Sequence, residues 1–139
     1  MDVHTKEQRH YNMSQIRSKN TQPELIVRKF LWKHGYRYRL HRKDLPGKPD
    51  IFLPKYNLVI FVNGCFWHMH KCKKFVLPST NKKFWYEKLS QNKIRDTKNY
   101  KKLKRAGWNY IVIWECQLTG NNEKALKKII GILHTLDKE

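Results

Sequence analysis

Four residues of this chain have the types and spacing of a metal site. Cys65, His70 and Cys72 form a Cys-x4-His-x-Cys pattern, and the remaining cysteine, Cys116, follows a predicted buried strand over 110–114. That strand is expected to lie beside the strand that leads into Cys65, so the four side chains could meet at one edge of a sheet. Three thiolates and one imidazole suit a closed tetrahedral Zn²⁺ site. Because protein ligands fill all four positions, we expect a structural site that supplies folding energy to its loop.

Spacing leaves two alternatives open for this loop. The cysteines could be ordinary buried thiols, although the placement of all three cysteines of the chain favours zinc. His68, which lies between Cys65 and His70, could be the nitrogen ligand in place of His70. If His68 is not a ligand, it lies on a loop that the metal would fix, where a histidine can act as the general base that activates water.

Asp50 is the main candidate for binding a second, different metal ion. It opens a predicted strand after the turn Leu45-Pro46-Gly47, and another strand follows at once. In metal-dependent nucleases an aspartate at such a position holds Mg²⁺ beside the scissile phosphate, and oxygen ligands suit that ion. The second strand, 58–63, contains neither an acid nor a lysine, so a backbone carbonyl such as that of Val62 would have to serve as a ligand. A turn-capping role is the alternative for Asp50.

Glu24 is a further candidate, with a strong structural alternative. It lies three residues after Thr21, which is the spacing of a capping box, and in such a box the glutamate only ties down the start of its own helix. The residues alone therefore favour the capping role over a functional one.

The charge of the chain indicates a polyanionic partner. Thirty Lys and Arg against eleven Asp and Glu give a formal net charge of +19. Residues 71–105 contain thirteen Lys or Arg, including Lys93 and Arg95, and only two acids. Surface helices usually mix both signs, so contact with the phosphates of a nucleic acid explains this segment better than solvation alone. Phe66 and Trp67 adjoin it in a polar loop, where exposed rings could stack on bases or wedge between them, unless both belong to the core.

Hydrophobic periodicity and cap residues predict the elements that must position these groups. In chain order these are a peripheral helix over 5–17, a helix from Thr21 to Gly35, strands over 36–40, 50–53 and 58–62, an irregular loop over 63–80, a long basic helix over 82–105, a strand over 110–114 and a helix capped by Asn121. The long helix should bury Phe84, Trp85, Leu89 and Leu103. The strand–helix–strand unit predicts a parallel crossover, so we expect an α/β fold with a mixed sheet flanked by helices.

The length of 139 residues suits a single domain over 1–139. No long uncharged apolar run could span a bilayer, and the first thirteen residues contain no apolar signal core. We therefore expect a cytoplasmic protein, where disulfides are disfavoured. Membrane-surface binding is less favoured than nucleic-acid binding, because the basic helix commits its aromatics to the core and offers no lipid-facing stripe.

Several segments together resemble the very short patch repair (Vsr) endonucleases. The most specific is the run from Asn63 to Cys72, Asn-Gly-Cys-Phe-Trp-His-Met-His-Lys-Cys, which is similar to the signature of that family. The resemblance extends across nearly the whole chain, through Asn12-Met13-Ser14-Gln15-Ile16, Thr21-x-x-Glu24, Leu45-Pro46-Gly47-Lys48-Pro49-Asp50, Phe84-Trp85-x-x-Lys88, Asn92-Lys93-x-Arg95-Asp96, Gly107-Trp108 and Trp114-Glu115-Cys116. Motifs this specific, all in register, are not expected by chance.

The resemblance implies a restriction-endonuclease-like α/β fold and a strand-specific nick in double-stranded DNA, 5′ to the thymine of a T:G mismatch. Such a mismatch arises when 5-methylcytosine deaminates. Asp50 and the main-chain oxygen of Val62 would bind the catalytic Mg²⁺. His68 would be the general base, Glu24 would support the active site, and Asp96 matches a recurrent acid of the catalytic set.

The same resemblance assigns His70, rather than His68, to the structural Zn²⁺ with the three cysteines. Phe66 and Trp67 would intercalate beside the mismatch from the major groove, and Met13 would enter from the minor-groove side on a DNA-contacting segment over 1–20. Lys93 and Arg95 would belong to the DNA-binding surface. A monomer associated with the nucleoid is expected, with mismatch-repair proteins as candidate partners.

Two positions depart from the family pattern. A histidine often precedes the glycine of the signature, where this chain has Asn63, and a threonine often supplies the main-chain ligand, where it has Val62. A change of side chain at residue 62 leaves the main-chain carbonyl in place, whereas loss of an imidazole at residue 63 could slow the phosphate chemistry.

Two alternative functions are a restriction-type or less selective nicking nuclease of the same fold, and a non-catalytic zinc-containing nucleic-acid-binding module.

Overall fold

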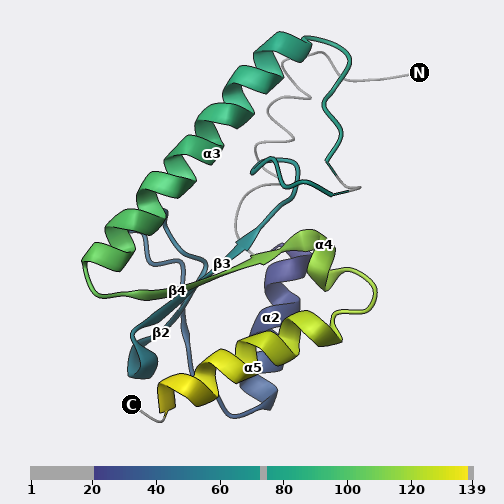
Figure 1. Ribbon diagram of the computed structural model, residues 1–139. Helices are drawn as coiled ribbons and strands as arrows, with labels where there is room; N and C mark the ends of the chain where they lie inside the picture. The colour runs from purple at the N-terminus through teal and green to yellow at the C-terminus, as the bar shows by residue number, and fades with distance from the viewer. Residues whose placement is uncertain (1–20, 73–74, 138–139) are drawn as a thin grey trace.

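The computed structural model describes residues 21–72 and 75–137 (Figure 1). The predicted helix over 5–17, including Met13, lies outside the described residues. In chain order the elements are α2 (Gln22–Lys33), β1 (Arg39–Leu40), β2 (Ile51–Leu53), the 3-10 helix η1 (Pro54–Tyr56), β3 (Leu58–Asn63), α3 (Lys82–Arg105), β4 (Asn109–Trp114), α4 (Glu115–Leu118) and α5 (Glu123–Asp137). No helix in these ranges is long and apolar enough to cross a membrane.

The four strands form one mixed sheet in the order β1-β2-β3-β4. The predicted hairpin of β2 and β3 is antiparallel, with Ile51 opposite Ile60. β3 and β4 are parallel and place Asn63 beside Trp114, so the predicted crossover through α3 is confirmed. The predicted strand over 36–40 is longer than β1, because only its last two residues pair with β2.

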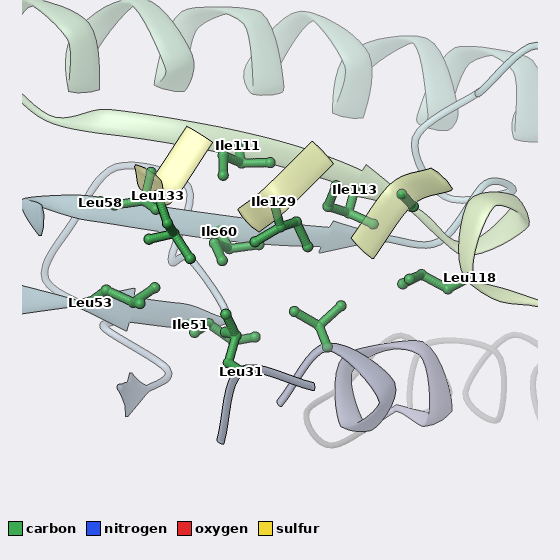
Figure 2. Packing of buried hydrophobic residues seen from close by; sticks show 12 residues of the cluster. Leu31, Ile51, Leu53, Leu58, Ile60, Ile111, Ile113, Leu118, Ile129 and Leu133 are labelled. Atoms are coloured by element: carbon green, nitrogen blue, oxygen red, sulfur yellow. The ribbon is translucent and has the colours of Figure 1, made fainter. Parts of the chain in front are cut away.

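Two helical layers cover the sheet, with α3 on one face and α2 and α5 on the other (Figure 1). Successive side chains of β3 face the two helical layers in turn. Leu58 and Ile60 belong to the cluster packed by α2 and α5, whereas Val59 and Phe61 pack on the α3 side with Leu103. Figure 2 shows the first cluster, in which side chains from three strands meet Ile129 and Leu133 of α5. Each such fully buried aliphatic side chain contributes about 1.5–3 kcal/mol, so the sheet is a firm base for the loops at its edge.

The buried face of α3 differs in part from the predicted one. Trp85, Leu89 and Leu103 are buried as predicted, but Phe84 is 49% exposed, so its assignment to the core was wrong. The amino-terminal part of α3 extends beyond the sheet and packs against the loop after β3 (Figure 1). Trp85 and Leu89 face that loop, whereas the ring of Phe84 lies on the more exposed side of the helix. Asn92 is buried instead, and its amide donates a hydrogen bond to the carbonyl of Trp67 at 3.3 Å.

Candidate active site and metal centre

A cavity of about 730 Å³ lies where the starts of α2 and β2 meet the end of β3. Its walls come from segments far apart in the sequence and include Asp50, Val62, His68 and Asp96. Gly47 makes this approach possible, because it has a φ of +80° and a Cβ there would lie 2.9 Å from the ring of Phe61. The turn before Asp50 can therefore fold directly over β3.

Asp50 and Val62 are in direct contact. The Val62 N–H donates to Oδ2 of Asp50 at 2.8 Å, and the Asp50 N–H donates to the carbonyl of Ile60 at 3.2 Å. In an extended strand the N–H and the C=O of one residue point to the same side. The carbonyl of Val62 therefore faces the side of the strand on which Asp50 lies. The two groups that the family resemblance names as Mg²⁺ ligands are brought together.

The environment of Asp50 favours a bound cation. The pKa of this carboxyl is raised to about 6, mainly by burial and also by the negative charge of Glu24. The hydrogen bond from Val62 and the nearby rings of His41 and His68 act in the opposite direction. A desolvated carboxylate beside a second carboxylate is stabilised by positive charge, and the hard oxygen donors fit a divalent ion.

Glu24 lies beside Asp50, and its carboxylate reaches a partner outside its own helix. Its backbone N–H donates to Oγ1 of Thr21 at 3.4 Å, which is the expected helix start. Glu24 as a whole is only 1% exposed, and its carboxylate accepts a hydrogen bond from Arg28 at 3.2 Å and lies within 3.3 Å of Nε2 of His41. One ligand atom from each of Glu24, His41 and Asp50 can be chosen so that all three lie within 4.8 Å of one another.

His41 is the member of this group that sequence reasoning missed. It lies outside regular structure with a φ of +53°, and its N–H donates to the carbonyl of Asp50 at 2.9 Å. No periodic pattern or motif spacing singles out a residue at such a position. The only available signal was a histidine in the segment that leads into the predicted turn at 45–47.

His68 and Asp96 form a hydrogen-bonded pair across the cavity. Nδ1 of His68 contacts Oδ2 of Asp96, which is on α3. A carboxylate that accepts from Nδ1–H fixes the ring and its tautomer, and it leaves Nε2 as the nitrogen that can accept a proton. Both residues line the cavity that contains Asp50. The pair has the arrangement of a general base and the acid that orients it.

The second candidate metal centre lies at the carboxyl ends of β3 and β4. Ligand atoms of Cys65, His70, Cys72 and Cys116 all lie within 4.8 Å of one another. Nδ1 of His70 is 3.6 Å from Sγ of Cys65 and 3.4 Å from Sγ of Cys116. This geometry and donor set could hold a tetrahedral Zn²⁺. Burial raises the pKa of the Cys65 thiol, so a metal ion bound here must displace a proton.

One indole separates the two histidines of this loop. Met69 has a φ of +51°, and the chain reverses there, so that His68 and His70 are directed to different partners. The ring of His70 stacks on Trp114 at 4.1 Å and 6°, and the ring of His68 meets Trp114 edge-on at 6.2 Å. His70, not His68, is the histidine that the structure places among the cysteines.

The predicted DNA-contacting residues are only partly on the surface. Trp67 is 6% exposed and packs with Trp85, while Phe66 is half-buried with its ring 5.2 Å from that of Trp67. Both residues line the cavity. Lys93 and Arg95 are exposed on α3.

Comparison with known proteins gives a consistent result. The profile of the family described as DNA mismatch endonuclease Vsr matches residues 1–74. The DNA mismatch endonuclease Vsr of Escherichia coli is 38% identical over 122 residues, which cover 88% of this chain and 78% of that protein. The type II nicking enzyme V.XorIIP of Xanthomonas oryzae pv. oryzae is 48% identical over 89% of this chain and 93% of its own length. V.NmeAIP of Neisseria meningitidis, also named a type II nicking enzyme, is 48% identical over 84% of each chain.

These likenesses cover most of the chain, including the cavity at Asp50 and the cysteine cluster. The chain therefore belongs to the Vsr family of DNA mismatch endonucleases and is a DNA endonuclease.

Proposed function

We propose that the chain is a Mg²⁺-dependent endonuclease that nicks one strand of duplex DNA 5′ to the thymine of a T:G mismatch, in very short patch repair. The observation that carries this proposal is the meeting of Asp50 and the His68–Asp96 pair at one cavity of a Vsr-family chain, with the carboxylate of Glu24 beside Asp50. Asp50 and the carbonyl of Val62 would hold the ion. When bound there, Mg²⁺ stabilises charge on the phosphate and lowers the pKa of a water.

The other residues have distinct roles in this proposal. Nε2 of His68 accepts the proton of the attacking water, and Asp96 holds the ring in the required tautomer and stabilises the imidazolium that forms. Glu24 adds a second carboxylate, which is held in place by Arg28 and has Nε2 of His41 beside it. The cysteine cluster, with Zn²⁺ as its proposed ion, fixes the loop on which His68 lies.

DNA contact would use the loop and α3 together. Lys93 and Arg95 lie exposed on the helix that carries Asp96, so phosphate contacts there would place the backbone near the cavity. Phe66 and Trp67 are proposed as the wedge beside the mismatch. Because Trp67 is buried, that role requires the aromatic cluster to open when DNA binds. Met13 is proposed for the opposite groove and lies outside the described residues.

A less selective nicking activity is the second candidate. The names of the relatives called type II nicking enzymes do not mention a mismatch. In addition, this chain has Asn63 at the position where the family signature often has a histidine. The amide of Asn63 donates to the hydroxyl of Tyr100 at 3.0 Å, so this side chain is held by α3. Its amide cannot exchange protons with a phosphate oxygen as an imidazole can.

Identical end-labelled duplexes that differ in one base pair separate the two candidates. With Mg²⁺, the T:G duplex should be nicked on the thymine strand much faster than duplexes with another mismatch or none, and omission of the ion should stop the reaction. Equal rates on matched and mismatched duplexes would favour the less selective enzyme. No metal-dependent cleavage of any duplex would contradict both candidates.

The Mg²⁺ requirement should depend on pH. Burial raises the pKa of Asp50 to about 6, so the ligand carboxylate is present above this pH and is lost as the pH falls through it. Below pH 6 the Mg²⁺ concentration for half-maximal nicking should rise about tenfold per pH unit, because each ion must displace a proton. Initial rates over a Mg²⁺ series between pH 5 and 8 measure this. A requirement that stays constant across that range would contradict the placement of the ion at Asp50.

A further inference from the structure

His41 is placed where it could coordinate a metal ion. Its Nε2 lies 3.3 Å from Oε1 and 3.2 Å from Oε2 of Glu24. His41, Glu24 and Asp50 each offer one ligand atom, and these three atoms lie within 4.8 Å of one another. His41 also lines the cavity and is tied to Asp50 through its backbone N–H at 2.9 Å. The imidazole of His41 therefore lies close to two carboxylates, of which that of Asp50 lines the cavity.

We propose that the imidazole of His41 is a direct ligand of the catalytic cation, which makes this a mixed nitrogen–oxygen site that binds Mn²⁺ more tightly than Mg²⁺. The inference rests on the proposed function, in that the cation is the one held by Asp50. It goes further by assigning a nitrogen ligand and a preference among metals.

The distances suit shared coordination. Neighbouring ligands in an octahedral shell lie about 3 Å apart when each is about 2.1 Å from the ion, which is close to the separation of Nε2 from the Glu24 oxygens. Both carboxylates are also held from outside the group. Oδ2 of Asp50 accepts from Val62, and Glu24 accepts from Arg28. Their positions therefore do not depend on His41, which can turn its nitrogen to an ion.

The donor chemistry sets the preference. Mg²⁺ takes oxygen ligands and keeps its waters, so an imidazole contributes little to its binding. Mn²⁺ accepts oxygen equally well but gains from a nitrogen donor, and transition ions generally bind imidazole more readily than Mg²⁺ does. A site with one imidazole and two carboxylates should therefore discriminate in favour of Mn²⁺, whereas the same site without the imidazole should discriminate much less.

The test uses the full chain, loaded with zinc first so that added Mn²⁺ does not enter the cysteine cluster. Calorimetric titration of wild type should show Mn²⁺ binding about tenfold or more tighter than Mg²⁺. Pulsed electron paramagnetic resonance of the bound Mn²⁺ should show coupling to an imidazole nitrogen. His41→Gln should remove the coupling and most of the preference while leaving Mg²⁺ affinity within about threefold, since glutamine can still donate a hydrogen bond to Glu24.

Three control variants locate the ion. His34→Gln changes an exposed imidazole near the end of α2 and should alter nothing. His68→Gln should keep the nitrogen coupling, because the proposed ligand is the other histidine of the cavity. Asp50→Asn should weaken the binding of both ions.

The result that overturns the proposal is a His41→Gln protein with wild-type Mn²⁺ affinity and nitrogen coupling, or a wild type with no coupling at all. In the first case, His41 only positions Glu24 through a hydrogen bond. Persistence of Mn²⁺ binding in Asp50→Asn would also overturn it, because the ion would then lie elsewhere. Failure of the proposed function is separate: a protein that nicks no mismatched duplex, yet loses its Mn²⁺ preference with His41, contradicts the mismatch activity and keeps the ligand assignment.

Discussion

Asp50→Asn should lower the rate of T:G nicking by at least about a thousandfold while changing affinity for the mismatched duplex only a few-fold. Asparagine has the shape of aspartate and can still accept the hydrogen bond from the Val62 N–H, so the hairpin should keep its register. What is lost is the negative charge that holds a cation next to the phosphate. A thousandfold corresponds to about 4 kcal/mol of transition-state stabilisation, within the several kcal/mol that a metal ion supplies.

The measurement is single-turnover nicking of a labelled duplex, with affinity determined in parallel. Asp44→Asn is the matched control, because Asp44 precedes the same turn but is exposed and paired with Arg42. It should nick at the wild-type rate. His68→Gln should lose about a hundredfold to ten-thousandfold through loss of the general base, again with affinity retained. If Asp50→Asn and His68→Gln both nicked as fast as Asp44→Asn, the assignment of the site would be wrong.

Local patterns in the sequence were sufficient to predict a helix or strand where its own residues determine its boundaries. The long basic segment was predicted as a helix over 82–105, and α3 has these bounds. The antiparallel hairpin and the parallel pair of β3 and β4 also follow from short apolar runs and the length of the connection. The parallel register then explains the cysteine cluster, because Asn63 beside Trp114 brings the residues that follow each strand to one edge of the sheet.

Features set by tertiary contacts were out of reach. Phe84 has the helical spacing of a core residue, but the sheet ends before it, and only the packing of the loop determines which stripe of α3 is covered. Asn92 is polar and was given no buried role, yet it is buried where it donates to the carbonyl of Trp67. His41 meets Glu24 across 17 positions of sequence through a left-handed backbone conformation that no local pattern specifies. The cluster that follows from strand register was thus predictable from local patterns, whereas the contact of His41 with Glu24, which depends on irregular backbone, was not.

Loss of the cysteine cluster should have the second large effect. It should remove stability as well as activity, whereas Asp50→Asn should remove activity alone. Cys116→Ser should release zinc, lower the midpoint of thermal unfolding sharply and abolish nicking, although every residue of the catalytic group remains. Structural zinc supplies about 10–16 kcal/mol of apparent binding free energy, as much as the entire stability of a typical small protein. The loop from Gly64 to Cys72 contains no helix or strand of its own, and its contacts with α3 through Trp67 and His68 leave the segment from His70 to Cys72 to be held by the cluster.

Zinc content by elemental analysis, thermal unfolding and nicking of the T:G duplex should be measured on Cys116→Ser and Asp50→Asn side by side. Cys116→Ser should lose its zinc, unfold at a lower temperature and no longer nick the duplex. Nicking is lost because His68 reaches Asp96 only while its loop is held beside Trp114. Asp50→Asn should keep its zinc and should unfold no earlier than wild type, since replacing a buried carboxylate whose pKa is raised removes a cost of folding near neutral pH. A Cys116→Ser protein that binds no zinc yet unfolds like wild type and nicks the mismatch would show that the cluster does not hold the catalytic loop in place.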